Sequence, residues 1–176
     1  SAAQDNEKLG LILYADDIEV SIPAKKVRSH VVRLIRELIE FEPKSHKTDI
    51  AQALKFLSST QKKKAIVFMI SDFMCENYEQ TLKIASKKHD ITGIRVYDIR
   101  EEKMPNLGMV TMLDAETGRT QLINTGSKTV RMNYEKHYLD KVNYFKESFR
   151  KSGSGVVNTR VDESYVTKLL GYFKSR

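Results

Sequence analysis

The chain has 176 residues, of which 40% are hydrophobic and 30% are charged, and these values suit a single globular domain. Its formal net charge is +7, and its longest apolar runs are only as long as a strand, so a membrane-spanning helix is not expected. The single cysteine, Cys75, excludes an internal disulfide framework and favours a reducing compartment, which we expect to be the cytoplasm.

The N-terminal part predicts a hairpin followed by two helices. Residues 9–14 are continuously apolar, as in a buried strand, and residues 18–22 alternate apolar and polar, as in an edge strand that Pro23 ends. From residue 26 to 41 the apolar residues recur with the period of an amphipathic helix. A second helix begins near Thr48, which we predict to cap its N-terminus.

The central part predicts a strand–helix–strand unit. Residues 65–70 are apolar at every position, so we expect this strand to be covered on both faces. A helix over residues 78–89 then leads to a strand over residues 91–97. Such a unit pairs its two strands in parallel through a right-handed crossover.

The remaining elements continue the alternation of strands and helices. They are strands over residues 108–113, 120–124 and 156–160, and helices over residues 128–151 and 163–173. This order predicts one α/β domain over residues 1–176, with a doubly wound, mostly parallel sheet and helices on both faces.

Oxygen-bearing side chains lie where the working site of such a sheet is expected, beyond the carboxyl ends of its strands. Asp72 ends the most apolar strand with Ser71 beside it, and Thr48 brings a hydroxyl from a helix N-terminus. Hydroxyl and carboxylate oxygens suit Mg²⁺, Mn²⁺ or Ca²⁺. These three residues are therefore candidate metal ligands, although Asp72 and Thr48 would equally serve as local caps.

Six segments, in the same order, resemble the bacterial "domain of unknown function fifty-eight" family. They are Leu9–Asp16, Thr48–Leu54, Ile70–Phe73, His89–Glu102, Asp114–Gly118 and Tyr165–Leu170. Members of that family look like von Willebrand factor A domains, which are Rossmann-like, and are commonly found beside MoxR-type AAA+ ATPases. The resemblance therefore implies a binding domain that works with such an ATPase, rather than an enzyme.

The resemblance also implies a metal-ion-dependent adhesion site, but only part of one. Such a site combines an Asp-x-Ser-x-Ser loop after the first strand with a Thr from a second loop and an Asp from a third. Thr48 matches the second element and Asp72 the third, whereas the Asp-x-Ser-x-Ser element is absent from this sequence. We therefore expect Mg²⁺, or Mn²⁺ or Ca²⁺ in its place, to bind weakly or not at all.

The same resemblance implies a domain that lacks its first strand, which would lie between the strand beginning at Leu9 and the strand beginning at Ala65. A gap at that place would expose strand edges and apolar faces. We therefore expect either a rearranged sheet or self-association with a second copy.

Three functions follow from these observations. The leading one is a non-enzymatic protein-interaction module, in which an acidic side chain of a protein partner completes the metal site. Asp98, Arg100 and Glu101 lie at the same edge and could frame the partner surface, although an exposed charged loop is the simpler interpretation. An alternative is a metal-dependent hydrolase or nuclease that uses Asp72 and Asp98.

The third function is nucleic-acid binding through basic clusters. These clusters are Lys25–Arg28, Lys44–Lys47, Lys62–Lys64 and Lys87–Lys88. Lysines near the C-terminus of a helix also stabilise it by interacting with the negative end of the helix dipole. No motif of aromatic residues that could stack on bases accompanies these clusters. We therefore regard a nucleic-acid partner as the weaker interpretation.

Overall fold

The computed structural model describes residues 7–26, 28–113 and 118–175. Its elements in chain order are β1 (Leu9–Tyr14), β2 (Ile18–Lys25), α1 (Arg28–Glu40), α2 (Ile50–Thr60), β3 (Ile66–Ser71), α3 (Glu79–Lys88), β4 (Asp90–Tyr97), the 3-10 helix η1 (Ile99–Glu101), β5 (Met109–Leu113), β6 (Thr120–Asn124), α4 (Lys128–Lys151), β7 (Gly155–Arg160) and α5 (Tyr165–Lys174). The fold is mixed α/β, as the alternation of strands and helices predicted.

The expected single sheet is only partly formed. In the described part of the chain the strands make three separate sheets, namely an antiparallel pair β1–β2, a parallel sheet in the order β3–β4–β7, and an antiparallel pair β5–β6. The parallel pairing of β3 with β4 confirms the predicted strand–helix–strand unit. β1 and β3 share no ladder. The doubly wound sheet is thus interrupted between them.

The N-terminal hairpin forms as predicted, but its second strand is longer than expected. β2 continues through Pro23 to Lys25. The pairing with β1 is irregular there, because the register shifts between Leu9 and Leu11. A proline has no N–H to donate, and it is tolerated at such an irregularity on an edge strand. The prediction that Pro23 ends the strand was therefore wrong.

An aromatic core lies on one face of the parallel sheet. The Phe73 ring stacks on Phe145 with centroids 4.1 Å apart and meets Phe149 edge-on at 5.3 Å. Gly93 of β4 makes room for the two phenylalanines of α4, because a Cβ at this position would lie 2.6 Å from a Phe149 ring carbon. The long helix α4 therefore packs very closely against the sheet.

The opposite face of β3 is largely uncovered. Ile66, Phe68 and Ile70 are 64%, 45% and 62% exposed, whereas Met69 between them is 6% exposed. α5 reaches this face, where the Phe173 ring meets Phe68 edge-on at 5.8 Å. The expectation that this strand is covered on both faces was wrong, because a single short helix cannot cover its whole length.

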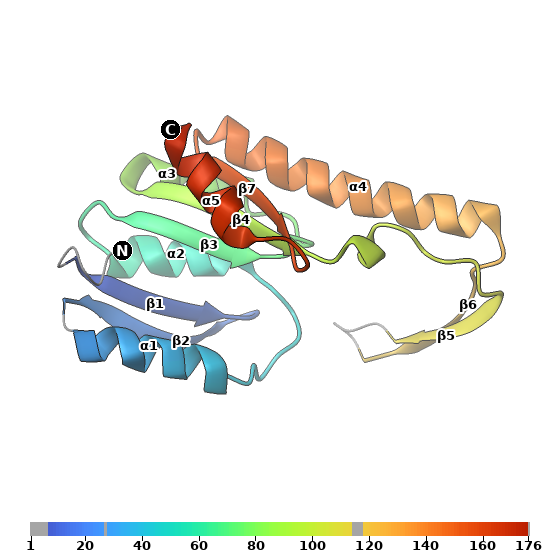
Figure 1. The fold of residues 1–176 in the computed structure, drawn as a ribbon, viewed down its shortest axis with the longest axis horizontal. Coiled ribbons are helices and arrows are strands. Elements are labelled where there is room, and N and C mark those ends of the chain that lie inside the picture. Colours follow the sequence, from blue (N-terminus) through green and yellow to red (C-terminus); the bar gives the residue numbers. More distant parts are fainter. Residues whose placement is uncertain (1–6, 27, 114–117, 176) are drawn as a thin grey trace.

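The hairpin β5–β6 lies at the far end of α4, away from the parallel sheet (Figure 1). Its base is fixed by the buried Thr125, whose hydroxyl donates to the Gly108 carbonyl at 2.8 Å and accepts from the Leu107 amide at 2.9 Å. Arg131 of α4 donates to the Thr125 carbonyl at 2.6 Å. Residues 114–117, which belong to the segment Asp114–Gly118 of the family resemblance, lie outside the described residues.

α4 is the longest helix, with 24 residues, but charged residues interrupt its apolar positions. Across the described ranges, no helix combines the length and the apolar character needed to cross a membrane.

Candidate functional site

Asp72 lies at the carboxyl end of β3, where the chain turns sharply into the core. The next residue, Phe73, has a φ of 56°, which is rare for a bulky side chain. The Ser71 hydroxyl accepts from the Phe73 amide at 3.1 Å, and Asp72 Oδ1 accepts from the Met74 amide at 3.2 Å. Ser71 also donates to Asp72 Oδ1 at 3.3 Å. These bonds hold the turn and place both predicted ligands at the rim of the sheet.

The N-terminus of α2 lies at the same rim. The N-cap is Asp49, whose carboxylate accepts from the Gln52 amide at 2.9 Å, so the prediction that Thr48 caps this helix was wrong by one residue. The Asp49 amide donates to the Ala15 carbonyl at 2.8 Å, which ties the start of α2 to the end of β1. Thr48, half-buried, immediately precedes this cap.

Cys75 lies between these two segments. Burial raises the pKa of its thiol above the ordinary value. The hydrogen bond with the Ile50 backbone lowers this pKa, whereas the negative charges of Asp72 and Asp49 raise it. A raised thiol pKa leaves the reactive thiolate scarce, which argues against a catalytic cysteine. The end of β3 and the start of α2 approach each other, because Phe73 and Ile50 belong to one buried cluster and Cys75 packs against it.

Tyr14, the last residue of β1, lies next to this group of side chains. Burial raises the pKa of its phenol, and so do the charges of Cys75 and Asp72. The hydroxyl is buried near Ser71, yet no hydrogen bond of good geometry forms to any of the described residues. Three elements, β1, α2 and β3, therefore bring oxygen atoms to one rim.

Arg95 of β4 fixes the backbone at Asp72. Its side chain is buried, and its Nε donates to the Asp72 carbonyl at 3.2 Å. Its Nη2 donates to the Tyr138 hydroxyl of α4 at 2.5 Å, and its guanidinium lies over the Tyr97 ring, 4.3 Å from the centroid. Aromatic faces and neutral acceptors thus compensate part of the cost of burying this charge.

Asp98 follows β4 as the N-cap of the short helix η1, which contains Arg100 and Glu101. The Asp98 carboxylate accepts from the Arg100 amide at 2.9 Å and forms an ion pair with the Arg100 guanidinium. Hydrogen bonds from that guanidinium and from that amide lower the pKa of Asp98 to about 2. The Glu101 carbonyl accepts from the Tyr134 hydroxyl at 2.9 Å. The Asp98 carboxylate is thus already bound to Arg100. The hydrogen bond from Tyr134 fixes this exposed segment to α4.

The rim offers an incomplete set of metal ligands. Carboxylate and hydroxyl oxygens are present at Asp72, Ser71 and Thr48, with Asp49 beside them, and this chemistry fits a hard divalent cation. Within the described ranges, however, no group of three or more histidine, cysteine, aspartate or glutamate side chains could hold a metal ion. A cation at this rim would therefore need further ligands from water or from a partner.

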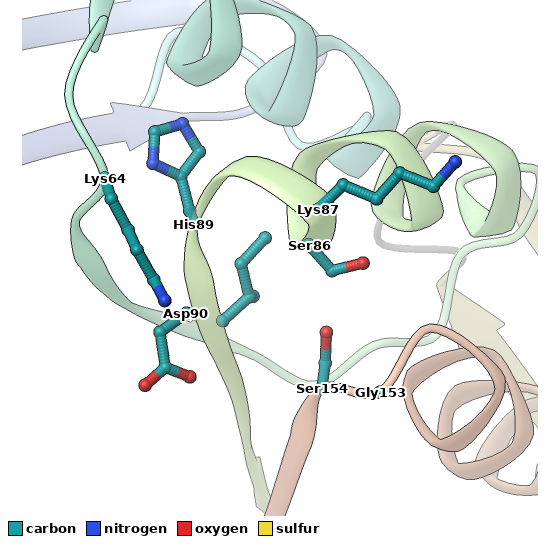
Figure 2. A pocket seen from close by; sticks show the side chains of 8 residues that line it. Lys64, Ser86, Lys87, His89, Asp90, Gly153 and Ser154 are labelled. Carbon is teal, nitrogen blue, oxygen red and sulfur yellow. The ribbon is translucent and has the colours of Figure 1, made fainter.

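A separate hollow of about 240 Å³ lies at the opposite end of the parallel sheet, where β4 and β7 begin. In Figure 2 the Lys64 side chain runs toward Asp90, and Ser86 and Ser154 lie on different sides of the hollow. Helices α3 and α4 both end here, and Lys87 in the last turn of α3 suits the negative end of the helix dipole. We assign no ligand to this hollow, because its charges have local roles.

Sequence reasoning missed several residues of the rim. Arg95 lies between Ile94 and Val96 in β4, and a charge flanked by apolar strand residues is a signal of a buried charge with a specific role. Asp49 is of a residue type that commonly caps helices, and it directly follows Thr48, which was predicted to be the cap. The contribution of Tyr138 could not be found, because it comes from a helix 43 positions away.

Comparisons with known proteins give a family and a fold. A family model described as "Protein of unknown function DUF58" matches residues 1–143. An uncharacterized protein of Mycobacterium avium is 25% identical over 158 residues, which is 88% of this chain and 93% of that protein. An uncharacterized protein of Mycobacterium tuberculosis is 22% identical over 172 residues, but this chain spans only 54% of its length.

A solved structure has a similar fold. It is the crystal structure of an aerotolerance-related membrane protein from Bacteroides fragilis that carries multiple mutations to serine. The superposition has a TM-score of 0.53 at 14% sequence identity and covers 99% of this chain and 84% of the other. At this identity the likeness concerns the fold alone.

Proposed function

Because this chain belongs to the DUF58 family of proteins of unknown function, we propose that it is a non-enzymatic protein-interaction module with a partial metal-ion-dependent adhesion site. In this proposal Thr48, Ser71 and Asp72 hold a divalent cation, with Mg²⁺ as the first candidate. An acidic side chain of the partner completes the coordination shell. The domain is of the von Willebrand factor A type, and the partner is a MoxR-type AAA+ ATPase.

The single observation that supports this proposal best is the approach of two segments at one rim. Ile50 at the start of α2 and Phe73 after β3 belong to one buried cluster, and Cys75 packs against it. Thr48 precedes the first of these segments and Ser71 belongs to the second, so oxygen ligands from both can face one ion. Mg²⁺ keeps several waters in protein sites, which suits a shell that this chain supplies only in part.

Metal-dependent hydrolysis finds less support. In the version of this alternative that uses Asp72 and Asp98, the Asp98 carboxylate is already bound by Arg100. An adhesion-type role requires only that Asp72 and the hydroxyls contribute oxygen atoms while a partner provides the rest.

The test is capture of a purified MoxR-type ATPase by the immobilised protein, with Mg²⁺ or with a chelator. We expect capture only with Mg²⁺, and we expect Asp72→Ala and Thr48→Val to weaken it strongly. Asp140→Ala removes an exposed carboxylate of α4 and serves as the matched control. Capture that survives both Asp72→Ala and the chelator would reject this mechanism.

A further inference from the structure

An apolar stripe runs along the solvent side of α1, which lies on the outside of the β1–β2 hairpin (Figure 1). The helix is held by its other side, where His30 and Leu34 are buried and His30 Nε2 donates to the Leu9 carbonyl at 3.0 Å. A spacing of three and four residues brings the exposed apolar residues together. We call them the α1 stripe, and they are between 51% and 78% exposed, namely Val32, Ile35, Leu38 and Ile39.

Basic side chains border the α1 stripe. Arg28 and Arg36 lie four positions before and four positions after Val32, so they belong to the same row of the helix. Lys25 and Lys26 directly precede the helix, and all four basic residues are exposed. We call these four residues the cationic border.

The acidic residues of α1 do not neutralise this border. Glu37 Oε1 lies 3.8 Å from Arg33 Nε, one turn away, and Glu40 follows on the same side of the helix. In the described ranges, none of the four residues of the cationic border forms an ion pair with another residue. Their charges are therefore available to a partner.

The helix dipole does not account for the cationic border. Lys25, Lys26 and Arg28 lie at the N-terminal end of α1, where the helix carries a partial positive charge and its first turn has no acidic residue. Lys87 and Lys88 differ in this respect, because they lie in the last turn of α3, where cations are favourable. A negatively charged partner would offset the repulsion at the start of α1.

An apolar stripe with a cationic border fits the surface of an anionic membrane. Nucleic acid matches the charge, but it offers no apolar medium for four exposed aliphatic side chains. Amphipathic helices of this kind lie in the plane of the membrane interface, with their apolar side at the boundary of the acyl chains. Long Lys and Arg side chains reach from there to the lipid phosphates.

We propose that α1 binds the surface of membranes that contain anionic lipids, through the α1 stripe and the cationic border. The domain then lies on the membrane with α1 parallel to its plane. Each Lys or Arg near such a surface strengthens binding about fivefold, so the border gives the preference for anionic lipids. This contact uses neither Asp72 nor a divalent cation, so its tests stand apart from that of the proposed function.

The first test is sedimentation of the purified chain with vesicles of phosphatidylcholine, either alone or mixed with phosphatidylserine. We expect binding to the mixed vesicles only, and we expect added salt to weaken it. The double variant Lys26→Gln, Arg28→Gln should bind roughly 25-fold more weakly. The double variant Lys62→Gln, Lys63→Gln is the matched control, because it removes the same charge from exposed positions outside α1. The proposal is overturned if the unmodified chain binds neither kind of vesicle, or if both double variants lose the same affinity.

A second pair of variants tests the apolar stripe. Ile39→Ser should lower the affinity for the mixed vesicles about tenfold or more, because an isoleucine no longer enters the acyl region. Ile84→Ser is the matched control, since Ile84 of α3 is 66% exposed and lies outside the stripe. If Ile39→Ser binds as tightly as the unmodified chain, the surface recognises charge alone. A polyanion such as nucleic acid would then replace the membrane as the partner.

A third measurement locates the contact directly. The chain contains no tryptophan, so Ile39→Trp introduces a single fluorescent reporter. We expect the mixed vesicles to shift its emission to the blue and brominated lipid to quench it, while Ile84→Trp keeps its emission. Ile39 is 78% exposed, so the melting temperature without vesicles should stay the same in both of its variants. A blue shift at Ile84 and none at Ile39 would reject α1 as the binding element.

Discussion

The two faces of β3 carry similar side chains, but one face is buried and the other is exposed to solvent. Met69 on the inner face packs with the aromatic rings of α4 and is 6% exposed, whereas Ile70, the next residue, is 62% exposed. Residue type does not distinguish these faces, because both are apolar. The difference lies in the elements that fold back onto each face, which are α2, α3 and α4 on the inner side and α5 alone on the outer side. Which face of β3 is buried therefore depends on the helices that pack against it and not on its own residue types.

The largest expected effect comes from removing an aromatic ring on the inner face. Phe145 is fully buried and stacked on Phe73, so Phe145→Ala should lower the free energy of unfolding by about 3–5 kcal/mol. Phe68→Ala on the outer face should cost only about 1 kcal/mol in the monomer, because that ring is already half in water. Urea denaturation at low protein concentration measures both. Equal losses would mean that the two faces do not differ in packing.

A smaller loss of stability is expected when the Tyr138 hydroxyl, which accepts a hydrogen bond from Arg95, is removed. Tyr138→Phe leaves the buried Arg95 without the acceptor on Nη2, and we expect it to cost about 1–3 kcal/mol. Tyr134→Phe is the matched control, since its hydroxyl bonds a carbonyl of the exposed helix η1 and water can replace it. The assignment of Arg95 as a support for Asp72 fails if both variants unfold at the same urea concentration.

The buried His89 should make stability depend on pH. Burial, followed by the positive charge of Lys88, lowers its pKa below the ordinary value of 6.5. The unfolded chain therefore takes up this proton more readily than the folded chain, and stability falls as the pH drops below 6.5. His89→Gln should reduce the loss of melting temperature between pH 7.5 and pH 5. A loss that is as large in His89→Gln as in the unmodified protein would contradict this assignment.

The smallest effect is expected at the exposed loop after β4. Arg100→Ala removes the ion pair to Asp98, and at neutral pH the melting temperature should fall only slightly, because Arg100 is 86% exposed and water screens the pair. The pKa of Asp98 should nevertheless rise from about 2 toward its ordinary value. A titration followed by carbon NMR measures this shift. A pKa that stays near 2 would mean that another group holds this carboxylate charged.

Local patterns predicted the elements well. The periodicity of residues 128–151 and the alternation of residues 18–22 are properties of short windows, and α4 and the β1–β2 hairpin appear where they were expected. The caps were less certain, because Thr48 and Asp49 are both good cap residues and only the backbone decides between them. Ser71 and Asp72 lie at the carboxyl end of β3, as the apolar run before them predicted, and their role as ligands stays a prediction.

Two features could not be predicted from local patterns. The exposure of Ile66 and Ile70 depends on which other elements reach β3, and an apolar strand carries the same pattern whether or not its cover is present. The polar connection from Tyr138 through Arg95 to Asp72 joins three elements that are far apart in the chain. Such contacts depend on how α4 lies across the sheet, which no single segment specifies.

The close approach at Gly93 helps to set the direction of α4. Phe145 and Phe149 meet this glycine, and Tyr138 binds Arg95, so this half of the helix is anchored to the sheet. The hairpin β5–β6 lies beyond the other end of the helix (Figure 1). With a rise of about 1.5 Å per residue, Lys128 lies roughly 15 Å further along the helix than Tyr138. The position of the hairpin therefore follows from the angle at which α4 crosses β4, and a larger side chain at position 93 would change that angle.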